Sequence, residues 1–243
     1  MHPTICQIGP FTIYSYGLML VIAFLVSLAL LIQQAEREKV DTDIIFNFAF
    51  LVFLSGIIGA RIFYVAQNAS YYLENPLEMI MLQRGGLSWF GGLIFGSASG
   101  VAYLKIKNVP VFKALDLIAP FVALGQAIGR IGCLLNGCCF GKASEFGLYF
   151  RVHNAVLIPT QAYSSLALIA IFIILRFLQD RSHKTGEIFF MYLVLYALKR
   201  FFIEFWRADN EIIFLGLTLF QLMSLAVFLF ALTILFSIKK SKN

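Results

Sequence analysis

The feature that most constrains this chain is a series of long apolar stretches without Asp, Glu, Lys or Arg. A helix needs about 20 predominantly apolar residues to cross the hydrocarbon core of a bilayer, so such stretches predict transmembrane helices. We count six uninterrupted stretches, and a seventh that contains Lys199, Arg200 and Glu204. The seven stretches are 11–32, 44–60, 85–104, 117–129, 154–175, 188–206 and 212–238.

Composition supports this interpretation. Hydrophobic residues make up 60% of the chain, charged residues 13%, and the mean hydropathy is +0.84, whereas a soluble domain carries about 25% charged residues. A disordered chain, a nucleic-acid-binding module and a disulfide-stapled secreted scaffold are therefore disfavoured. We expect an all-α membrane protein, with a single seven-span transmembrane domain that covers residues 1–243.

The distribution of Lys and Arg predicts the orientation, because these residues collect in cytoplasmic loops. With the N-terminus outside, eleven of them fall in inner segments and four in outer segments, while Arg61, Arg130, Lys199 and Arg200 fall in the membrane zone. This predicts a cytoplasmic C-terminus. Residues 1–10 lack the basic region of a cleavable signal peptide, so the first stretch is expected to stay as a helix.

Ionisable residues gather at the outer ends of the predicted spans. A charge inside a span costs about 2.5 to 3.5 kcal/mol on insertion scales and persists mainly where it faces a partner or a polar cavity. Arginines near helix ends also snorkel to headgroups, and Arg200 could simply neutralise Glu204 four residues on. One acid cannot balance four arginines, however, so the group predicts a site for an anion, best a phosphate. Its members are Arg61, Arg130, Arg200, Glu204 and Arg207.

A glycine-rich segment, 125–141, closes the fourth stretch and surrounds Arg130. Glycines this dense let a ligand or a neighbouring backbone approach closely, and they let the chain turn out of the helix around Asn136.

Seven motifs together resemble those of the bacterial prolipoprotein diacylglyceryl transferases. Each motif alone is weak, but their order and spacing agree along nearly the whole chain. They are Tyr16–Met19, Gly59–Arg61, Gly85–Gly92, Asp116–Pro120, Gly129–Gly132, Pro159–Gln161 and Arg200–Arg207.

The resemblance implies an enzyme that transfers the diacylglyceryl group of phosphatidylglycerol to the lipobox cysteine of prolipoproteins, the first step of lipoprotein maturation. It implies a multi-pass protein of the bacterial cytoplasmic (inner) membrane, with its site near the outer leaflet and no cofactor. Catalytic roles are implied for Tyr16, Arg130, Arg200 and Glu204. Lipid or phosphate binding is assigned to Arg130, Arg61, Arg200, Arg207, Asn136, Gly141 and Gln161.

The chain also departs from the family pattern. Phe90 stands where the family often has a histidine proposed as a base, Cys133 and Cys138 replace an asparagine and a glutamate, and Ile158 opens the loop that a histidine usually opens. Three routes to thiol deprotonation remain: Glu204, Tyr16, or the positive field of the arginines. We favour the field, because cationic surroundings lower the pKa of a reactive thiol.

The cysteines admit several interpretations. Cys133, Cys138 and Cys139 have the spacing C-x4-C-C, which offers few ligands for zinc, and His153 is the only nearby histidine. A disulfide between Cys6 and Cys138 or Cys139 is an alternative. The favoured interpretation is that all four are small packing residues, so no metal site is expected.

Two other functions compete with the transferase. A lipid-binding or lipid-moving protein without chemistry would explain the missing histidine and glutamate. Proton-coupled transport would need carboxylates or histidines inside the bundle, for which Asp116 and Glu204 are the candidates.

Overall fold

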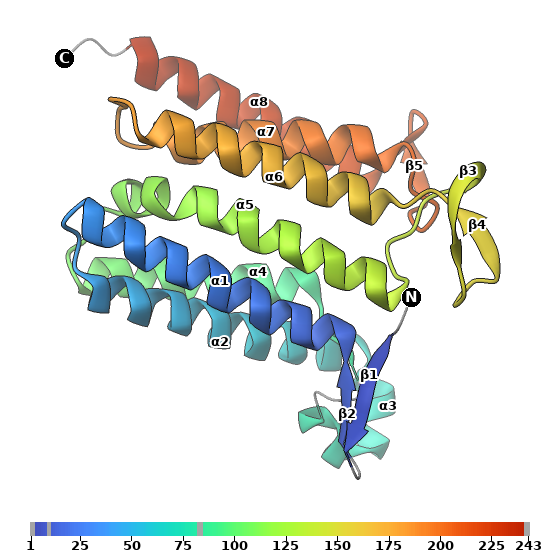
Figure 1. Ribbon diagram of the computed structural model, residues 1–243. Helices are drawn as coiled ribbons and strands as arrows, with labels where there is room; N and C mark the ends of the chain where they lie inside the picture. Colours follow the sequence, from blue (N-terminus) through green and yellow to red (C-terminus); the bar gives the residue numbers. More distant parts are fainter. Residues whose placement is uncertain (1–2, 9–10, 82–84, 241–243) are drawn as a thin grey trace. The chain divides into compact units, whose positions relative to one another are not determined.

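The protein is mostly helical in the computed structural model, which describes residues 3–8, 11–81 and 85–240 (Figure 1). Each predicted apolar stretch overlaps one long helix. A short helix, α3 (Ala69–Glu74), and the 3-10 helix η1 (Pro76–Ile80) follow α2. The long helices are α1 (Ser15–Arg37), α2 (Thr42–Gln67), α4 (Trp89–Ile106), α5 (Val111–Asn136), α6 (Thr160–Gln179), α7 (Glu187–Glu204) and α8 (Leu219–Lys240).

Among the described residues, five helices are long and apolar enough to cross a membrane: α1, α2, α5, α6 and α8. The expectation of a helical membrane protein is confirmed at this level. Helix α7 carries charged side chains in its interior and at its ends, from Glu187 to Glu204. Seven crossings, and the side on which each terminus lies, stay predictions.

Two helices continue through the arginines at which we expected the spans to end. Helix α2 passes Arg61 and ends at Gln67, and α5 passes Arg130 and ends at Asn136. The expected boundaries were wrong because a charged residue interrupts an apolar stretch without breaking the hydrogen bonds of the helix main chain.

Three of the predicted spans begin within a β-hairpin. Strand β1 (Thr4–Ile8) pairs with β2 (Phe11–Tyr14), β3 (Ala143–Phe150) with β4 (Ala155–Leu157), and β5 (Ile212–Phe214) with β6 (Leu217–Thr218), all antiparallel. Between β5 and β6, Leu215 and Gly216 have φ angles of 50° and 75°. Positive φ at both positions is the requirement of a tight two-residue hairpin turn. In the first, fifth and seventh stretches the helix therefore begins later than expected.

The chain divides into two compact units, one formed by residues 1–31 and 115–243 and the other by residues 32–114. In the second unit α2 packs closely on α4. A side chain at Gly59 would place its Cβ 2.7 Å from the carbonyl oxygen of Gly91, and the hydroxyls of Ser55 and Ser99 are 2.6 Å apart. The prediction of one domain over residues 1–243 stays a prediction.

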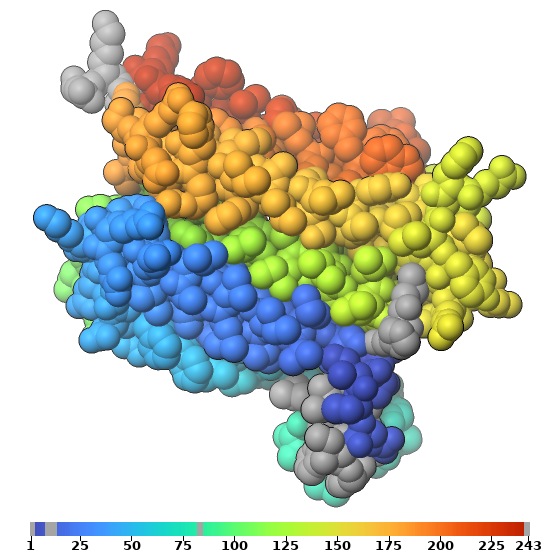
Figure 2. All heavy atoms as spheres, in the orientation of Figure 1, coloured from blue at the N-terminus to red at the C-terminus, as the bar shows by residue number. Residues whose placement is uncertain are grey.

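The first unit has its core between α5, α6, α7 and α8. Alanines at a spacing of four on α5 let α6 and α7 approach, and Ser165 of α6 donates a hydrogen bond to the carbonyl of Ala127 at 2.9 Å. The β3–β4 hairpin, yellow in both views, extends beyond the start of α6 (Figures 1 and 2). The core residues are Ala119, Ala123, Ala127, Leu168, Ile171, Leu175, Ile188 and Tyr192, with Phe190, Val194, Ala231 and Leu235 between α7 and α8.

Large apolar side chains also point outward from these helices. Leu166 and Ile173 of α6 are 66% and 59% exposed, and Phe230 of α8 is 60% exposed; α6 forms much of the surface seen in Figure 2. Contiguous apolar surface of this kind is rare on soluble proteins and is suited to contact with lipid tails.

Asp116 ties three helices together at the end of the bundle where α5 begins. Its carboxylate accepts hydrogen bonds from the backbone N–H of Gly186 at 2.5 Å and of Phe189 at 2.8 Å, at the start of α7. Gln179 of α6 donates to the carbonyl of Asp116. Fourteen residues separate Asp116 from Arg130, about 21 Å along a helix. This carboxylate thus caps α7. The capping role accounts for the buried Asp116 carboxylate, so proton transport is not needed to explain it.

Candidate active site

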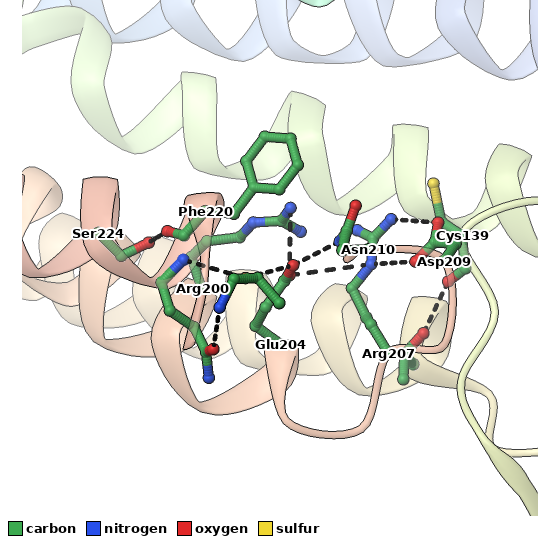
Figure 3. A network of polar contacts seen from close by, with 11 residues as sticks. Cys139, Arg200, Glu204, Arg207, Asp209, Asn210, Phe220 and Ser224 are labelled. Carbon is green, nitrogen blue, oxygen red and sulfur yellow. Dashed lines mark hydrogen bonds and ion pairs between the residues drawn. The ribbon is translucent and has the colours of Figure 1, made fainter. Parts of the chain in front are cut away.

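Glu204, the last residue of α7, is the centre of a buried polar network. Its side chain is 0% exposed. One carboxylate oxygen accepts a hydrogen bond from Thr218 Oγ1 at 3.1 Å and another from Asn210 Nδ2. The other oxygen faces Arg200 Nη2 at 3.2 Å and Arg207 Nε at 3.9 Å. Figure 3 shows the two guanidinium groups on either side of this carboxylate, so Glu204 holds two arginines together.

Arg200 is held from a second direction by an aromatic ring. Its guanidinium carbon lies 4.6 Å from the centroid of the Phe220 ring on α8, and its side chain is 13% exposed. A ring face attracts a cation, particularly where water is excluded. The ion pair expected from the spacing of Arg200 and Glu204 is confirmed, and the ring fixes the direction of the guanidinium.

Arg207 follows α7 and forms a two-pronged pair with Asp209. Nε donates to one carboxylate oxygen at 2.8 Å and Nη2 to the other at 2.5 Å. Burial alone would lower the pKa of Arg207, but the bonds to Asp209 and the nearby Glu204 carboxylate raise it above its ordinary value. Arg207 therefore stays charged although its side chain is only 9% exposed.

Gly141 joins the end of α5 to the end of α7. Its main chain pairs with Arg207 in an antiparallel β-bridge, and its N–H donates to the carbonyl of Ile158 at 2.9 Å. A Cβ at this position would lie 2.7 Å from both the Ile158 Cβ and the Trp206 carbonyl oxygen. The backbone approach requires glycine here, so the structure shows Gly141 as a junction between two segments.

Arg130 lies in the same network, near the C-terminal end of α5. Its guanidinium interacts electrostatically with Arg207, with Tyr196 of α7 and with the thiols of Cys133 and Cys139. Arg200 in turn interacts with Arg130. The structure thus brings Arg130, Arg200 and Arg207 into one cluster, although they come from different segments of the chain.

Tyr16 reaches this cluster from the start of α1. It interacts with Arg130 and with the thiols of Cys133, Cys138 and Cys139. A Cβ on Gly132 would lie 3.5 Å from the Cα of Tyr16, so the two helices are close at this point.

The loop after α5 is pinned at three consecutive carbonyl groups. His153 Nε2 lies 2.8 Å from the oxygen of Gly137, Gln161 Nε2 donates to that of Cys138 at 2.6 Å, and Thr160 Oγ1 donates to that of Cys139 at 2.7 Å. The Pro-Thr-Gln motif therefore fixes the loop beside Arg130. Gln161, predicted to bind lipid, still has an unpartnered buried oxygen, Oε1, among the described residues.

The four cysteines are free thiols, and Cys6 is exposed, so the disulfide considered from the sequence is not formed. Asn136, another predicted lipid-binding residue, hydrogen-bonds to the side chain of Cys138. Hydrogen bonds from Cys133 and Cys138, with Arg130 and Arg207 close by, lower the pKa of the Cys139 thiol below its ordinary value.

The cluster keeps a positive charge. The cations are Arg130, Arg200, Arg207 and Lys199, which lies 4.4 Å from the centroid of the Tyr196 ring and is only 8% exposed. The carboxylates in the network are Glu204 and Asp209. Even without Lys199 the arginines outnumber the carboxylates, so the site suits an anionic group. Guanidinium groups bind phosphate oxygens in bidentate geometry.

Arg61 belongs to the second unit. There, every N–H group of its guanidinium donates to a backbone carbonyl. Its five N–H groups point to five carbonyl oxygens at 2.5 to 3.2 Å, and the rings of Tyr64 and Tyr72 lie 5.9 and 5.3 Å from its Cζ. Phosphate binding by Arg61 would require some of these bonds to be exchanged. The accepting carbonyls are those of Glu78, Met79, Met81, Gly85 and Gly86.

Several residues of the network were missed by sequence reasoning. Asp209 and Asn210 follow Arg207 in a polar turn, and that turn was the available signal for them. Thr160 stands inside a recognised motif, but Thr218 lies within the apolar stretch 212–238 and gives no signal. Sequence reasoning identified Lys199 as a charged residue within a predicted span, but it did not assign Lys199 to the site.

The fold and the site define a polytopic helical membrane protein with a buried cationic cluster at one end of a helix bundle. The family model for prolipoprotein diacylglyceryl transferase matches residues 3–237, and the chain belongs to this family of transferases.

Proteins named phosphatidylglycerol–prolipoprotein diacylglyceryl transferase are similar over most of their length. The one from Clostridium tetani is 33% identical over 216 residues, which cover 86% of each chain. That from Bacillus cytotoxicus is 35% identical over 250 aligned positions, with 98% of this chain and 91% of the relative covered. That from Staphylococcus aureus strain MSSA476 is 32% identical, with 97% and 88% covered.

Proposed function

We propose that this protein transfers the diacylglyceryl group of phosphatidylglycerol to the lipobox cysteine of prolipoproteins. The observation that carries this proposal is the buried cluster in which Arg200 and Arg207 pair with the Glu204 carboxylate. Arg130 interacts with both of these arginines and adds excess positive charge. The names of the relatives supply the substrates. The lysine and arginine distribution supports seven spans, with the N-terminus outside and the site near the outer leaflet of the cytoplasmic membrane.

The reaction is a displacement at a carbon atom. The sulfur of the lipobox cysteine forms a C–S bond to the glycerol carbon that carries the phosphate, the C–O bond breaks, and glycerol phosphate leaves. Negative charge grows on the departing phosphate, so fixed cations around it lower the barrier. We propose that Arg130 binds that phosphate and that Arg200 and Arg207 are its cationic neighbours. Gln161 and Asn136 hold the loop that shapes the site.

The attacking sulfur must be a thiolate, and we propose that the arginine field favours it. Glu204 is buried and its oxygens are engaged by Asn210, Thr218 and the two arginines. A carboxylate in these surroundings is better placed to position arginines than to collect a proton. Tyr16 lies beside the cluster and is suited to orient the substrate. The thiol proton then leaves to water at the membrane surface.

Incubation of the purified protein with phosphatidylglycerol vesicles and a lipobox peptide tests the function. We expect the peptide mass to increase by one diacylglyceryl unit, and a peptide with serine in place of the cysteine to stay unchanged. Binding of phosphatidylglycerol without any mass increase would instead support a lipid-binding protein without chemistry.

Glu204→Gln separates a positioning role from that of a base. The amide keeps an oxygen for Thr218 but no longer neutralises Arg200 and Arg207, so these arginines should move apart. We expect kcat/KM to fall at least tenfold, equivalent to about 1.4 kcal/mol, mainly through a higher KM for phosphatidylglycerol. Glu204→Asp should recover part of the loss, and the pH profile of kcat should keep its shape.

The matched control is Glu187→Gln at the other end of α7, where the carboxylate pairs with Lys239 at 3.4 Å. This variant should have ordinary kinetics. Complete loss of kcat in Glu204→Gln at every pH, with KM unchanged, would assign proton transfer to Glu204.

A further inference from the structure

Three thiols converge where α5 ends. The Sγ atoms of Cys133, Cys138 and Cys139 all lie within 4.8 Å of one another. Cys133 is on the last turns of the helix, and the chain then reverses through Gly137, with a φ of 78°, and Cys139, with a φ of 60°. Only this tight reversal brings a C-x4-C-C spacing to one point, which the spacing alone did not predict.

The separation of the sulfur atoms suits a metal ion. Zinc binds thiolate sulfur at about 2.3 Å, so three sulfurs around one ion lie about 4 Å apart. The observed upper limit of 4.8 Å is close to that value. The three sulfurs are therefore already close to the separation that one shared ion requires.

The loop that carries two of these thiols is held in place. Thr160 and Gln161 bind the carbonyls of Cys139 and Cys138, and His153 binds that of Gly137. A ligand set fixed in advance loses little conformational freedom when an ion binds. The left-handed conformation of Cys139, unusual for a residue with a side chain, is maintained by these contacts.

The charge of the surrounding residues also favours binding of a metal ion by the three thiols. Three thiolates and one divalent ion form a complex with one negative charge, and Arg130 and Arg207 lie close enough to interact with Cys139. The arginines repel a bare cation, but they stabilise the anionic complex that results when each thiol has released its proton. The same cluster that suits a phosphate thus suits a metal–thiolate group.

We propose that Cys133, Cys138 and Cys139 form a binding site for one thiophilic divalent ion of the zinc class. Soft thiolate ligands select such ions over magnesium or calcium. Each thiol gives its proton to the solvent as its sulfur binds the ion, so binding releases protons. Three protein ligands leave a fourth tetrahedral position for water. This site goes beyond the transferase function and does not depend on it.

Titration of the full-length protein with Cd²⁺ tests the proposal, in detergent and with a phosphine reductant that keeps the thiols reduced. We expect one Cd²⁺ per chain, an ultraviolet sulfur-to-cadmium charge-transfer band, and release of protons into weak buffer. Cys133→Ser, Cys138→Ala and Cys139→Ser should each weaken binding by about 100-fold or more, because each removes one of three metal–sulfur bonds.

Cys6→Ser is the matched control, because Cys6 is exposed on β1 and should leave Cd²⁺ affinity unchanged. Circular dichroism and thermal unfolding without metal verify the fold of each variant, and Cys138→Ala decides the matter if the buried Cys133→Ser variant does not fold. Absence of saturable Cd²⁺ binding by the unmodified protein would overturn the proposal. Cd²⁺ affinity as high in Cys138→Ala and Cys139→Ser as in the unmodified protein, or loss of binding in Cys6→Ser, would overturn it as well.

Discussion

Arg130→Ala is expected to lower diacylglyceryl transfer by about 100- to 1,000-fold, the usual cost of removing one preorganised donor that stabilises developing negative charge. The reason is position. Arg130 is the arginine that interacts with Tyr16, with the thiols of Cys133 and Cys139 and with Arg207. Mass measurement of the lipobox peptide over time gives the rate.

Folding should survive this substitution. Arg130 lies among like charges, Arg200 and Arg207, so its removal relieves repulsion, and the midpoint of thermal unfolding should stay the same or rise. Arg130→Lys should retain part of the activity, because an ammonium keeps the charge and loses the bidentate geometry. Arg176→Ala, at the other end of the bundle beside Asp180, is the control with normal rates. Full activity in Arg130→Ala would remove Arg130 from the mechanism.

Gly141→Ala is expected to abolish activity and to lower the midpoint of thermal unfolding. The new methyl group would lie 2.7 Å from the Trp206 carbonyl oxygen and from the Ile158 Cβ, so the β-bridge to Arg207 must open. Overpacking of this kind costs about 1–3 kcal/mol. Arg207 would then lose its position beside Glu204, which disrupts the cation cluster.

Gly129→Ala is the matched control. A Cβ on Gly129 meets nothing within 4 Å, and alanine is favoured over glycine in a helix interior by about 1 kcal/mol. Its unfolding midpoint should be unchanged or higher, with ordinary activity. If both variants behaved alike, close approach at Gly141 would not be the reason for glycine there.

Sequence reasoning located the helices because an apolar stretch of sufficient length has few other structures available in a membrane. It placed their ends poorly. Residues 11–14 and 212–218 are equally hydrophobic whether they form strands or helix, so hydrophobicity does not distinguish the two structures. Turns such as Leu215–Gly216 decide that these segments form strands. Arg61 and Arg130 seemed to end helices, yet both helices continue through them.

The candidate site was predictable where partners share one helix and less so where they do not. Arg200 and Glu204 lie four residues apart on α7, and their ion pair follows from helical geometry. The approach of the three thiols depends on a left-handed turn, which no spacing rule reveals. The carbonyl cage of Arg61 depends on a loop that folds back on α2. These contacts arise from tertiary structure and have no local signature.

The bridge between Gly141 and Arg207 has a consequence for biogenesis. Ribosomes deliver the chain from the N-terminus, so the segment around Gly141 is synthesised well before its pairing partner exists. A nascent chain that ends before Glu204 holds Arg130 and the neighbouring thiols without Glu204, Arg207 and Asp209, which complete the ion-pair network. The cation cluster is therefore complete only after α7 and the turn that follows it have been synthesised.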